Sequence, residues 1–196
     1  MKTLLIVDAQ LDFMPNGGLA VENGDQIVSH INLVQPQYNL VVATQDWHPQ
    51  HHISFASNHD NYKPFQKRDI DGYRQTLWPD HCVQGDKGAE FHPNMRTNCI
   101  EAIFRKGTDP KIDSYSAFYD NHHTKSTGLA GYLKDKSCKT IDICGLAGDI
   151  CVYFTIKDAL TEGFQVRVLE KATKALDQER FDQQKEELKA EGVVFL

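Results

Sequence analysis

The sequence has no long apolar run. Its longest uninterrupted apolar stretches, such as residues 4–7 and 150–154, are far shorter than the ~20 residues that a helix needs to cross a bilayer. Asp8 also ends the first stretch before it reaches the roughly 7 to 15 apolar residues of a secretory signal. These absences argue against a membrane partner and lead us to expect a cytoplasmic protein.

Positive charge is also in short supply. The chain has 21 lysines and arginines against 27 aspartates and glutamates, which gives a formal net charge of -6. Affinity for nucleic acids depends on cations that neutralise phosphates, so an acidic chain is a poor match for a phosphate backbone. We therefore expect no nucleic-acid partner.

Cysteine is scarce, and its spacing forms no recognisable pattern. The chain has five cysteines, an odd number, and no two of them form a Cys-x-x-Cys pair. This argues against a disulfide framework and against a zinc site built from cysteines. At least one thiol is expected to be free. The cysteines are Cys82, Cys99, Cys138, Cys144 and Cys151.

What the chain does have is an alternation of apolar strands and amphipathic helices. Its 196 residues, 40% of them hydrophobic, suffice for one domain with a full core. Short runs of Val, Ile and Leu predict strands at 4–7, 40–43, 100–104, 140–144, 166–169 and 193–195. Apolar residues at helical spacing predict helices at 25–34, 125–134, 149–161 and 178–190. We expect a three-layer, doubly wound, Rossmann-like α/β domain with a mostly parallel six-stranded sheet.

Polar residues that could carry chemistry follow several of these strands. Asp8, Asp46, Lys106 and Cys151 lie at the carboxyl ends of predicted strands or a few residues beyond. Ligands of doubly wound folds gather at that edge of the sheet. The stretch from 45 to 98 is long, polar and rich in His, Pro, Asp and Asn, but its many aromatic residues argue for order. Long connections of this kind are usually functional when they are ordered.

Cys151 is the first candidate for catalysis. It follows a glycine-containing turn and opens a predicted helix, where free amides favour a thiolate and could hold an oxyanion. A buried structural thiol is the commoner fate of a cysteine. Asp8 could take the thiol proton and deliver it to a leaving group, or cap a turn, as Asp12 could. Lys106 could stabilise the thiolate, or be an exposed lysine at a strand end.

A second cluster has the residue types of a metal site. Asp46 and His48 are separated by one residue, His52 follows four residues later, and His81 lies in the segment Trp78-Pro79-Asp80-His81-Cys82. One carboxylate with two or three imidazoles suits zinc, iron(II) or manganese and leaves positions for water or substrate. A histidine-rich loop can also be merely solvated, so we assign no role to the other histidines.

Taken together, these residues closely resemble the nicotinamidase branch of the isochorismatase-like cysteine hydrolases, over essentially the whole chain. The segments that match this family are highly specific for it as a set, because they occur in the family's order along the chain. Two residues depart from the family pattern: Gly148 stands where relatives commonly have Thr, and Ile150 where close relatives often have Tyr. We expect these two differences to affect substrate preference and rate more than the type of reaction. The matching segments are 7–13, 44–49, 54–57, 77–83, 104–107, 113–118 and 145–152.

The resemblance implies a set of catalytic roles. Cys151 would be the nucleophile, Asp8 the proton-transfer residue and Lys106 the third catalytic member. The backbone amides of Ala147 and Cys151 would form the oxyanion hole, with a cis peptide before Ala147.

The resemblance also implies a metal and an aromatic pocket. One divalent metal ion, zinc before iron or manganese, would be held by Asp46, His48 and His81, with waters and His52 as candidates for the remaining positions. The isochorismatase branch generally lacks this metal set, which favours nicotinamide as the substrate. The pyridine ring would lie among Phe13, Trp78 and Tyr115.

The implied activity is hydrolysis of nicotinamide to nicotinate and ammonia through a cysteine thioester, in NAD salvage, with pyrazinamide as a further candidate substrate. The implied organisation is one isochorismatase-like hydrolase domain, 1–196, with a metal-binding and substrate-covering insertion at about 45–98. Two alternatives stay open: a related amidohydrolase for another small carboxamide or an N-carbamoyl compound, and a catalytically silent ligand-binding member. A homo-oligomer also stays open.

Overall fold

The computed structural model describes all 196 residues and has a six-stranded sheet at its centre. The strands lie in the order β5-β2-β1-β6-β7-β8, and every neighbouring pair is parallel. This confirms the predicted α/β fold with a six-stranded parallel sheet. The strands are β1 (Thr3–Val7), β2 (Leu40–Asp46), β5 (Ala102–Lys106), β6 (Thr140–Gly145), β7 (Gln165–Thr173) and β8 (Val194–Phe195).

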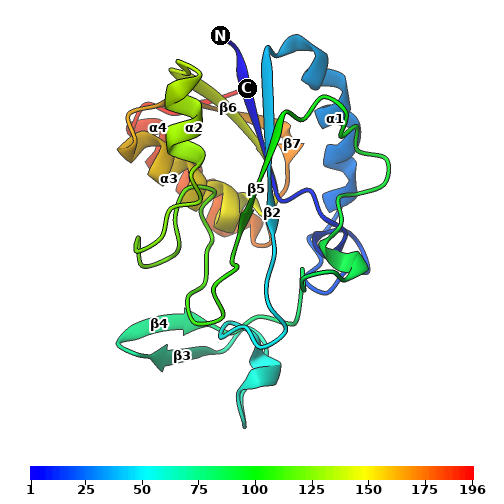
Figure 1. Cartoon of the computed structure of the whole chain (residues 1–196), viewed down its shortest axis with the longest axis vertical. Coiled ribbons are helices and arrows are strands. Elements are labelled where there is room, and N and C mark those ends of the chain that lie inside the picture. Colours follow the sequence, from blue (N-terminus) through cyan, green and yellow to red (C-terminus); the bar gives the residue numbers. More distant parts are fainter.

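Helices cover both faces of the sheet, which makes three layers (Figure 1). One face carries α1 (Ile27–Val34), and the other carries α2 (Leu129–Asp135), α3 (Tyr153–Thr161) and α4 (Gln178–Ala190). Every residue of β1 and β2 is buried, because a strand between two helical layers has no solvent-facing side. Continuous apolar runs were therefore the right signal for these strands. No helix is long and apolar enough to span a bilayer.

Several element boundaries differ from the prediction. Helix α1 begins at Ile27, because residues 24–26 form a 3-10 turn, and α2 begins at Leu129, four residues later than expected. Helix α3 begins at Tyr153, after a π-helical turn at Gly148–Val152. Strand β5 begins at Ala102, two residues later than expected, and extends to Lys106, so that Lys106 belongs to the strand itself.

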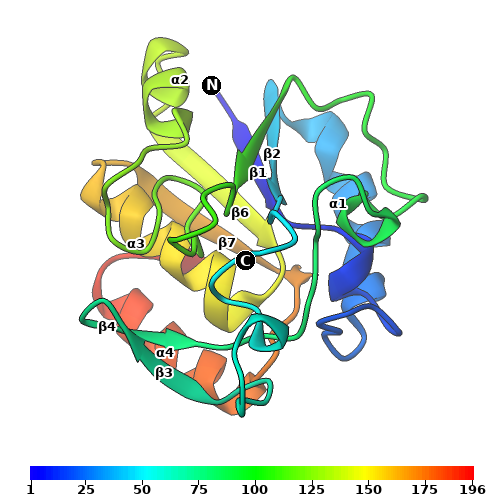
Figure 2. The same cartoon turned by 60° about the horizontal axis from the view of Figure 1, so that its bottom comes forward.

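The stretch between β2 and β5 is ordered at the carboxyl end of the sheet. It contains an antiparallel hairpin, β3 (Lys67–Ile70) and β4 (Tyr73–Thr76), which lies beside the start of α4 (Figure 2). Phe55 and Leu77 in this stretch are fully buried and anchor it. The hairpin was missed because its residues are mostly polar and partly exposed. Further 3-10 turns occur at Leu11–Phe13, Gln35–Gln37, Ala56–Asn58 and Lys87–Ala89.

Candidate active site

The three predicted catalytic residues meet at the carboxyl end of the sheet. Lys106 Nζ lies 2.9 Å from Asp8 Oδ2 and 3.5 Å from Cys151 Sγ. Strands β1 and β5 deliver the acid and the lysine, and the turn after β6 delivers the thiol, so three chain segments converge on one point. All three residues are buried. The prediction that Asp8, Lys106 and Cys151 lie together at the carboxyl ends of the strands is therefore confirmed.

Lys106 is not the exposed lysine of the alternative interpretation. Burial alone would lower the pKa of its ammonium, but the carboxylates of Asp46 and Asp8 beside it raise that pKa well above its usual value. Burial raises the pKa of Asp8, and it also raises the pKa of the Cys151 thiol, against the opposing effect of Lys106. The sulfur thus rests as a protonated thiol beside a carboxyl group and a permanent cation.

Asp46 links this group to the predicted metal ligands. Its Oδ1 accepts a hydrogen bond from Lys106 Nζ at 2.7 Å, while its Oδ2 lies 3.3 Å from His48 Nε2 and 3.7 Å from His81 Nε2. Burial alone would raise the pKa of Asp46, but Lys106 and His48 hold it well below its usual range. Asp46 is therefore a carboxylate that points one oxygen at two imidazoles.

The two imidazoles are aimed by backbone carbonyls. His48 Nδ1 is 3.0 Å from Gly107 O, and His81 Nδ1 is 2.7 Å from Pro79 O. Each ring thereby turns its Nε2 atom toward Asp46. The second nitrogen of a metal-bound imidazole is usually held in this way. The candidate ligand atoms of Asp46, His48 and His81 all lie within 4.8 Å of one another, which makes this donor set fit a divalent metal.

His52 lies next to this cluster. Its ligand atom is within 4.8 Å of those of His48 and Asp113, and its ring centroid is 4.2 Å from that of His48. Nδ1 is 2.6 Å from Ser54 Oγ, whereas the buried Nε2 atom has no hydrogen-bond partner. Burial, with the neighbouring His48, lowers the pKa of His52 to about 4, so the ring is neutral at physiological pH.

The turn that carries Cys151 has an irregular backbone. The Leu146–Ala147 peptide is cis, in agreement with the resemblance, and a π-helical turn, Gly148–Val152, follows it. The sequence had suggested an ordinary helix start for Cys151, which does not describe this turn. The Ala147 carbonyl accepts hydrogen bonds from Ile150 N and Val152 N, while the Ala147 amide donates none within the chain. Ala147 lines a pocket beside Cys151.

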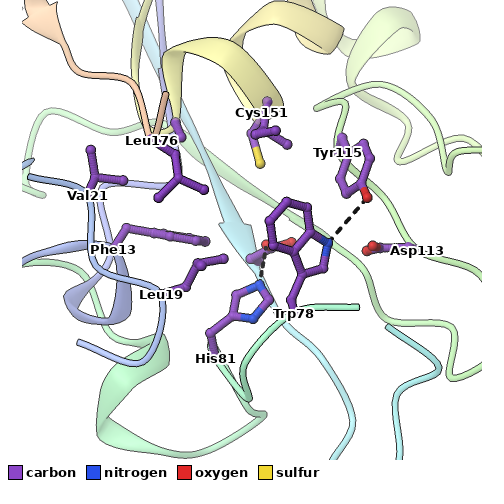
Figure 3. Close-up of a pocket in the computed structure, with 12 residues that line it drawn as sticks. Phe13, Leu19, Val21, Trp78, His81, Asp113, Tyr115, Cys151 and Leu176 are labelled. Atoms are coloured by element: carbon purple, nitrogen blue, oxygen red, sulfur yellow. Dashed lines mark hydrogen bonds and ion pairs between the residues drawn. The ribbon is translucent and has the colours of Figure 1, made fainter. Parts of the chain in front are cut away.

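The pocket beside Cys151 is mainly apolar (Figure 3). The aromatic residues Phe13, Trp78 and Tyr115 all line it, and Trp78 Nε1 donates a 3.2 Å hydrogen bond to Tyr115 Oη. A flat aromatic molecule suits such walls. The other lining residues are Leu19, Val21, Asp46, His81, Asp113, Ala147, Ile150, Cys151 and Leu176.

Four lining residues, Leu19, Val21, Asp113 and Leu176, were not singled out in the sequence, and Ile150 was noted there only as a departure from the family pattern. Asp113 begins one of the segments that carry the family resemblance, so a signal for it was present. Leu176 comes from the connection between β7 and α4. No pattern in the sequence marks it, because its place in the pocket depends on how that connection folds back over the Cys151 turn.

Comparison with known proteins places the chain in a family. The model of the isochorismatase domain matches residues 2–196. The nicotinamidase of Acinetobacter baylyi is 47% identical over 174 residues, which are 89% of this chain and 81% of that protein. The structure of a nicotinamidase pyrazinamidase of Acinetobacter baumanii superposes with a TM-score of 0.96 at 43% identity and covers 100% of this chain and 95% of its own.

A third similar protein has a metal in its structure. The pyrazinamidase of Pyrococcus horikoshii in complex with zinc has a TM-score of 0.82 at 35% identity, over 100% of this chain and 98% of its own. The domain match and these similarities extend over nearly the whole chain. The chain therefore belongs to the isochorismatase domain family.

Proposed function

We propose that this protein hydrolyses nicotinamide to nicotinate and ammonia in NAD salvage, with Cys151 as the nucleophile. The observation that carries the proposal is the contact of Lys106 Nζ with both Asp8 and Cys151 beside an aromatic pocket. The 47% identity to the nicotinamidase of Acinetobacter baylyi supports it. A catalytically silent binding protein would have no need for a buried acid, cation and thiol in mutual contact.

The first half-reaction follows from the contacts of the thiol. Because burial raises the pKa of the thiol, attack requires a base within reach, and Asp8 is that base. As Asp8 takes the proton, the sulfur attacks the carboxamide carbon, and the carbonyl oxygen becomes an oxyanion. The amides of Ala147 and Cys151 hold this oxyanion, and loss of one such donor typically costs about 10²- to 10³-fold in turnover.

Expulsion of ammonia completes the first half-reaction, and hydrolysis of the thioester then returns the enzyme to its starting state. Asp8 gives its proton to the amide nitrogen, the C–N bond breaks, and ammonia leaves a thioester on Cys151. A water molecule gives a proton to Asp8 as its oxygen attacks the thioester carbon. The C–S bond then breaks, nicotinate leaves, and Asp8 returns the proton to the sulfur of Cys151. Throughout, the Lys106 ammonium keeps a positive charge beside the carboxylate and the sulfur.

We also propose that Asp46, His48 and His81 hold one divalent metal ion, zinc before iron or manganese. The carbonyl-anchored imidazoles and the convergent carboxylate support this assignment, as does the zinc complex of the Pyrococcus horikoshii protein. His52 is a candidate fourth ligand because its buried Nε2 atom has no other partner. When bound, the metal supplies a Lewis acid that can fix a pyridine nitrogen.

The stretch from about 45 to 98 serves, in this proposal, as the metal-binding and substrate-covering insertion of a single domain. His48, His52 and His81 belong to it, and so does Trp78 in the pocket wall. The substrate ring would lie among Phe13, Trp78 and Tyr115, a pocket that also suits pyrazinamide.

Ammonia release from nicotinamide tests the proposal. We expect turnover by the wild-type protein, no turnover by Cys151→Ala, and unchanged fold and metal content in that variant. The exposed Cys99 gives a matched control, Cys99→Ala, which should keep full activity. Chelation should reduce turnover, and added zinc should restore it. Substantial residual activity in Cys151→Ala would contradict covalent catalysis, and release of ammonia only from other carboxamides or N-carbamoyl compounds would favour the related amidohydrolase.

A further inference from the structure

The Gln10 side chain forms hydrogen bonds with both the backbone N–H and the backbone carbonyl of Asp46. Gln10 Nε2 donates a 2.8 Å hydrogen bond to Asp46 O, and Asp46 N donates one of 2.8 Å to Gln10 Oε1. Gln10 Nε2 also donates to Ala89 O at 2.9 Å. The side chain is fully buried, and all of its polar atoms have partners. One amide group thus satisfies both peptide groups of a single residue.

The topology explains why Asp46 needs this support. Strand β1 pairs with β2 only as far as Ile6 and Ala43, whereas β2 continues to Asp46. On its other side Asp46 still pairs with Lys106 of β5. The last residue of β2 has therefore lost its strand neighbour on the β1 side. Gln10 takes the place of that neighbour with a side chain instead of a backbone.

We propose that Gln10 is a positioning residue that fixes Asp46 for metal binding. The inference rests on the proposed metal site. Asp46 directs Oδ1 to Lys106 and Oδ2 to the imidazoles, so a small rotation of its backbone moves both oxygens from their partners. Loss of a group that orients a metal ligand typically weakens metal binding about 10- to 100-fold.

Gln45 provides a matched control. It is the same residue type, is also buried, and donates from Nε2 to the same Ala89 oxygen at 3.2 Å. Its side chain makes no hydrogen bond to Asp46. Replacing either glutamine by methionine keeps the length and removes the hydrogen bonds. Only Gln10→Met removes the two bonds to Asp46.

The experiment compares zinc binding by the metal-free wild-type protein, Gln10→Met and Gln45→Met, in competition with a chromophoric chelator. Circular dichroism and the thermal midpoint of each metal-free protein show whether it is folded and how much stability it lost. We expect Gln10→Met to bind zinc about 10- to 100-fold more weakly than wild type. Gln45→Met should stay close to the wild-type affinity even though it loses stability.

Two outcomes would overturn the positioning role while leaving the metal site intact: wild-type zinc affinity in Gln10→Met, or an equal loss of affinity in both variants. No zinc binding by the wild-type protein would overturn the proposed metal site and this inference with it. Should Gln10→Met fail to fold, Gln10→Glu and Gln45→Glu take its place. Gln10→Glu keeps an acceptor for Asp46 N, removes the donor to Asp46 O, and is judged by the same criteria.

Discussion

Lys106 Nζ donates a 2.7 Å hydrogen bond to Asp46 Oδ1, which joins the proposed catalytic group directly to the proposed metal site. The same ammonium lies 2.9 Å from Asp8 Oδ2. One buried cation thus faces two buried carboxylates. Because an isolated charge is very costly to bury, the two sites depend on each other for their stability as well as for their chemistry.

Lys106→Met tests this dependence. The variant keeps a long side chain but leaves Asp8 and Asp46 without their cation, and removal of one partner of a buried ion pair costs about 3 to 5 kcal/mol. We expect a loss of that size in the free energy of unfolding of the metal-free protein, measured in urea, together with loss of ammonia release. Lys139→Met, at an exposed position, should change stability by less than about 0.5 kcal/mol. Similar losses in both variants would contradict the prediction.

Gly107→Ala should disturb the metal site through His48. Gly107 has a φ of 65°, and a Cβ atom there would lie 2.3 Å from His48 Cε1 and 2.5 Å from His48 Nδ1. We expect the imidazole to be displaced, zinc retention after dialysis to fall, and stability to drop by more than about 1 kcal/mol.

The control for Gly107→Ala is Gly163→Ala, which has a φ of 87° and open space around the added methyl group. Gly163→Ala places a non-glycine residue at a positive φ, as Gly107→Ala does, but its Cβ atom meets no neighbouring side chain. It should therefore lose stability but retain zinc. Full zinc retention in Gly107→Ala would contradict the assignment of His48 as a ligand.

The sequence predicted those parts of the molecule that depend on local pattern. Residues 4–7 are all apolar because β1 is covered on both faces, and this made the strand easy to recognise. Asp8 and Lys106 could be placed together because parallel strands end at one edge. The family resemblance also predicted the cis peptide before Ala147, which the structure contains. The catalytic roles that it implies remain predictions.

Other parts depend on contacts between distant segments and left no local signal. Gln10 could be seen beside Asp8 in the sequence, but its bonds to Asp46 arise only because β2 extends beyond β1. The strands of the β3–β4 hairpin are mostly polar on both faces, so they lack the alternation of apolar and polar residues that predicts a strand. Leu176 reaches the pocket through a connection that Asp149 holds in place.

Asp120 predicts a pH-dependent contribution to stability. Burial alone would raise its pKa, but hydrogen bonds from the Thr124 hydroxyl and from the amides of Thr124, His122 and Lys125 hold the pKa below its usual range. Because the folded pKa is the lower one, the carboxylate stabilises the fold above the unfolded pKa of about 4. This contribution is lost as the pH falls through the folded pKa.

We therefore expect Asp120→Ala to lower the free energy of unfolding by about 1 to 3 kcal/mol at neutral pH. The difference from wild type should shrink in acid, as measured by urea unfolding at pH values from neutral down to about 3. Asp60→Ala, at an exposed position, should change stability by less than about 0.5 kcal/mol throughout. A difference between Asp120→Ala and wild type that stays constant in acid would refute the role of the charge.

Asp149→Asn should loosen the pocket wall without touching a reacting group. The buried Asp149 carboxylate accepts hydrogen bonds from Leu176 N at 2.8 Å, Asp177 N at 3.1 Å and Arg180 Nε at 3.0 Å. An asparagine amide would meet one of these donors with its own N–H, so we expect Leu176 to move, the KM for nicotinamide to rise, and stability to fall by about 1 to 3 kcal/mol. Arg180→Met keeps both backbone bonds and should raise KM less. Steady-state ammonia release and urea unfolding measure both effects, and a wild-type KM in Asp149→Asn would show that the pocket wall does not depend on this carboxylate.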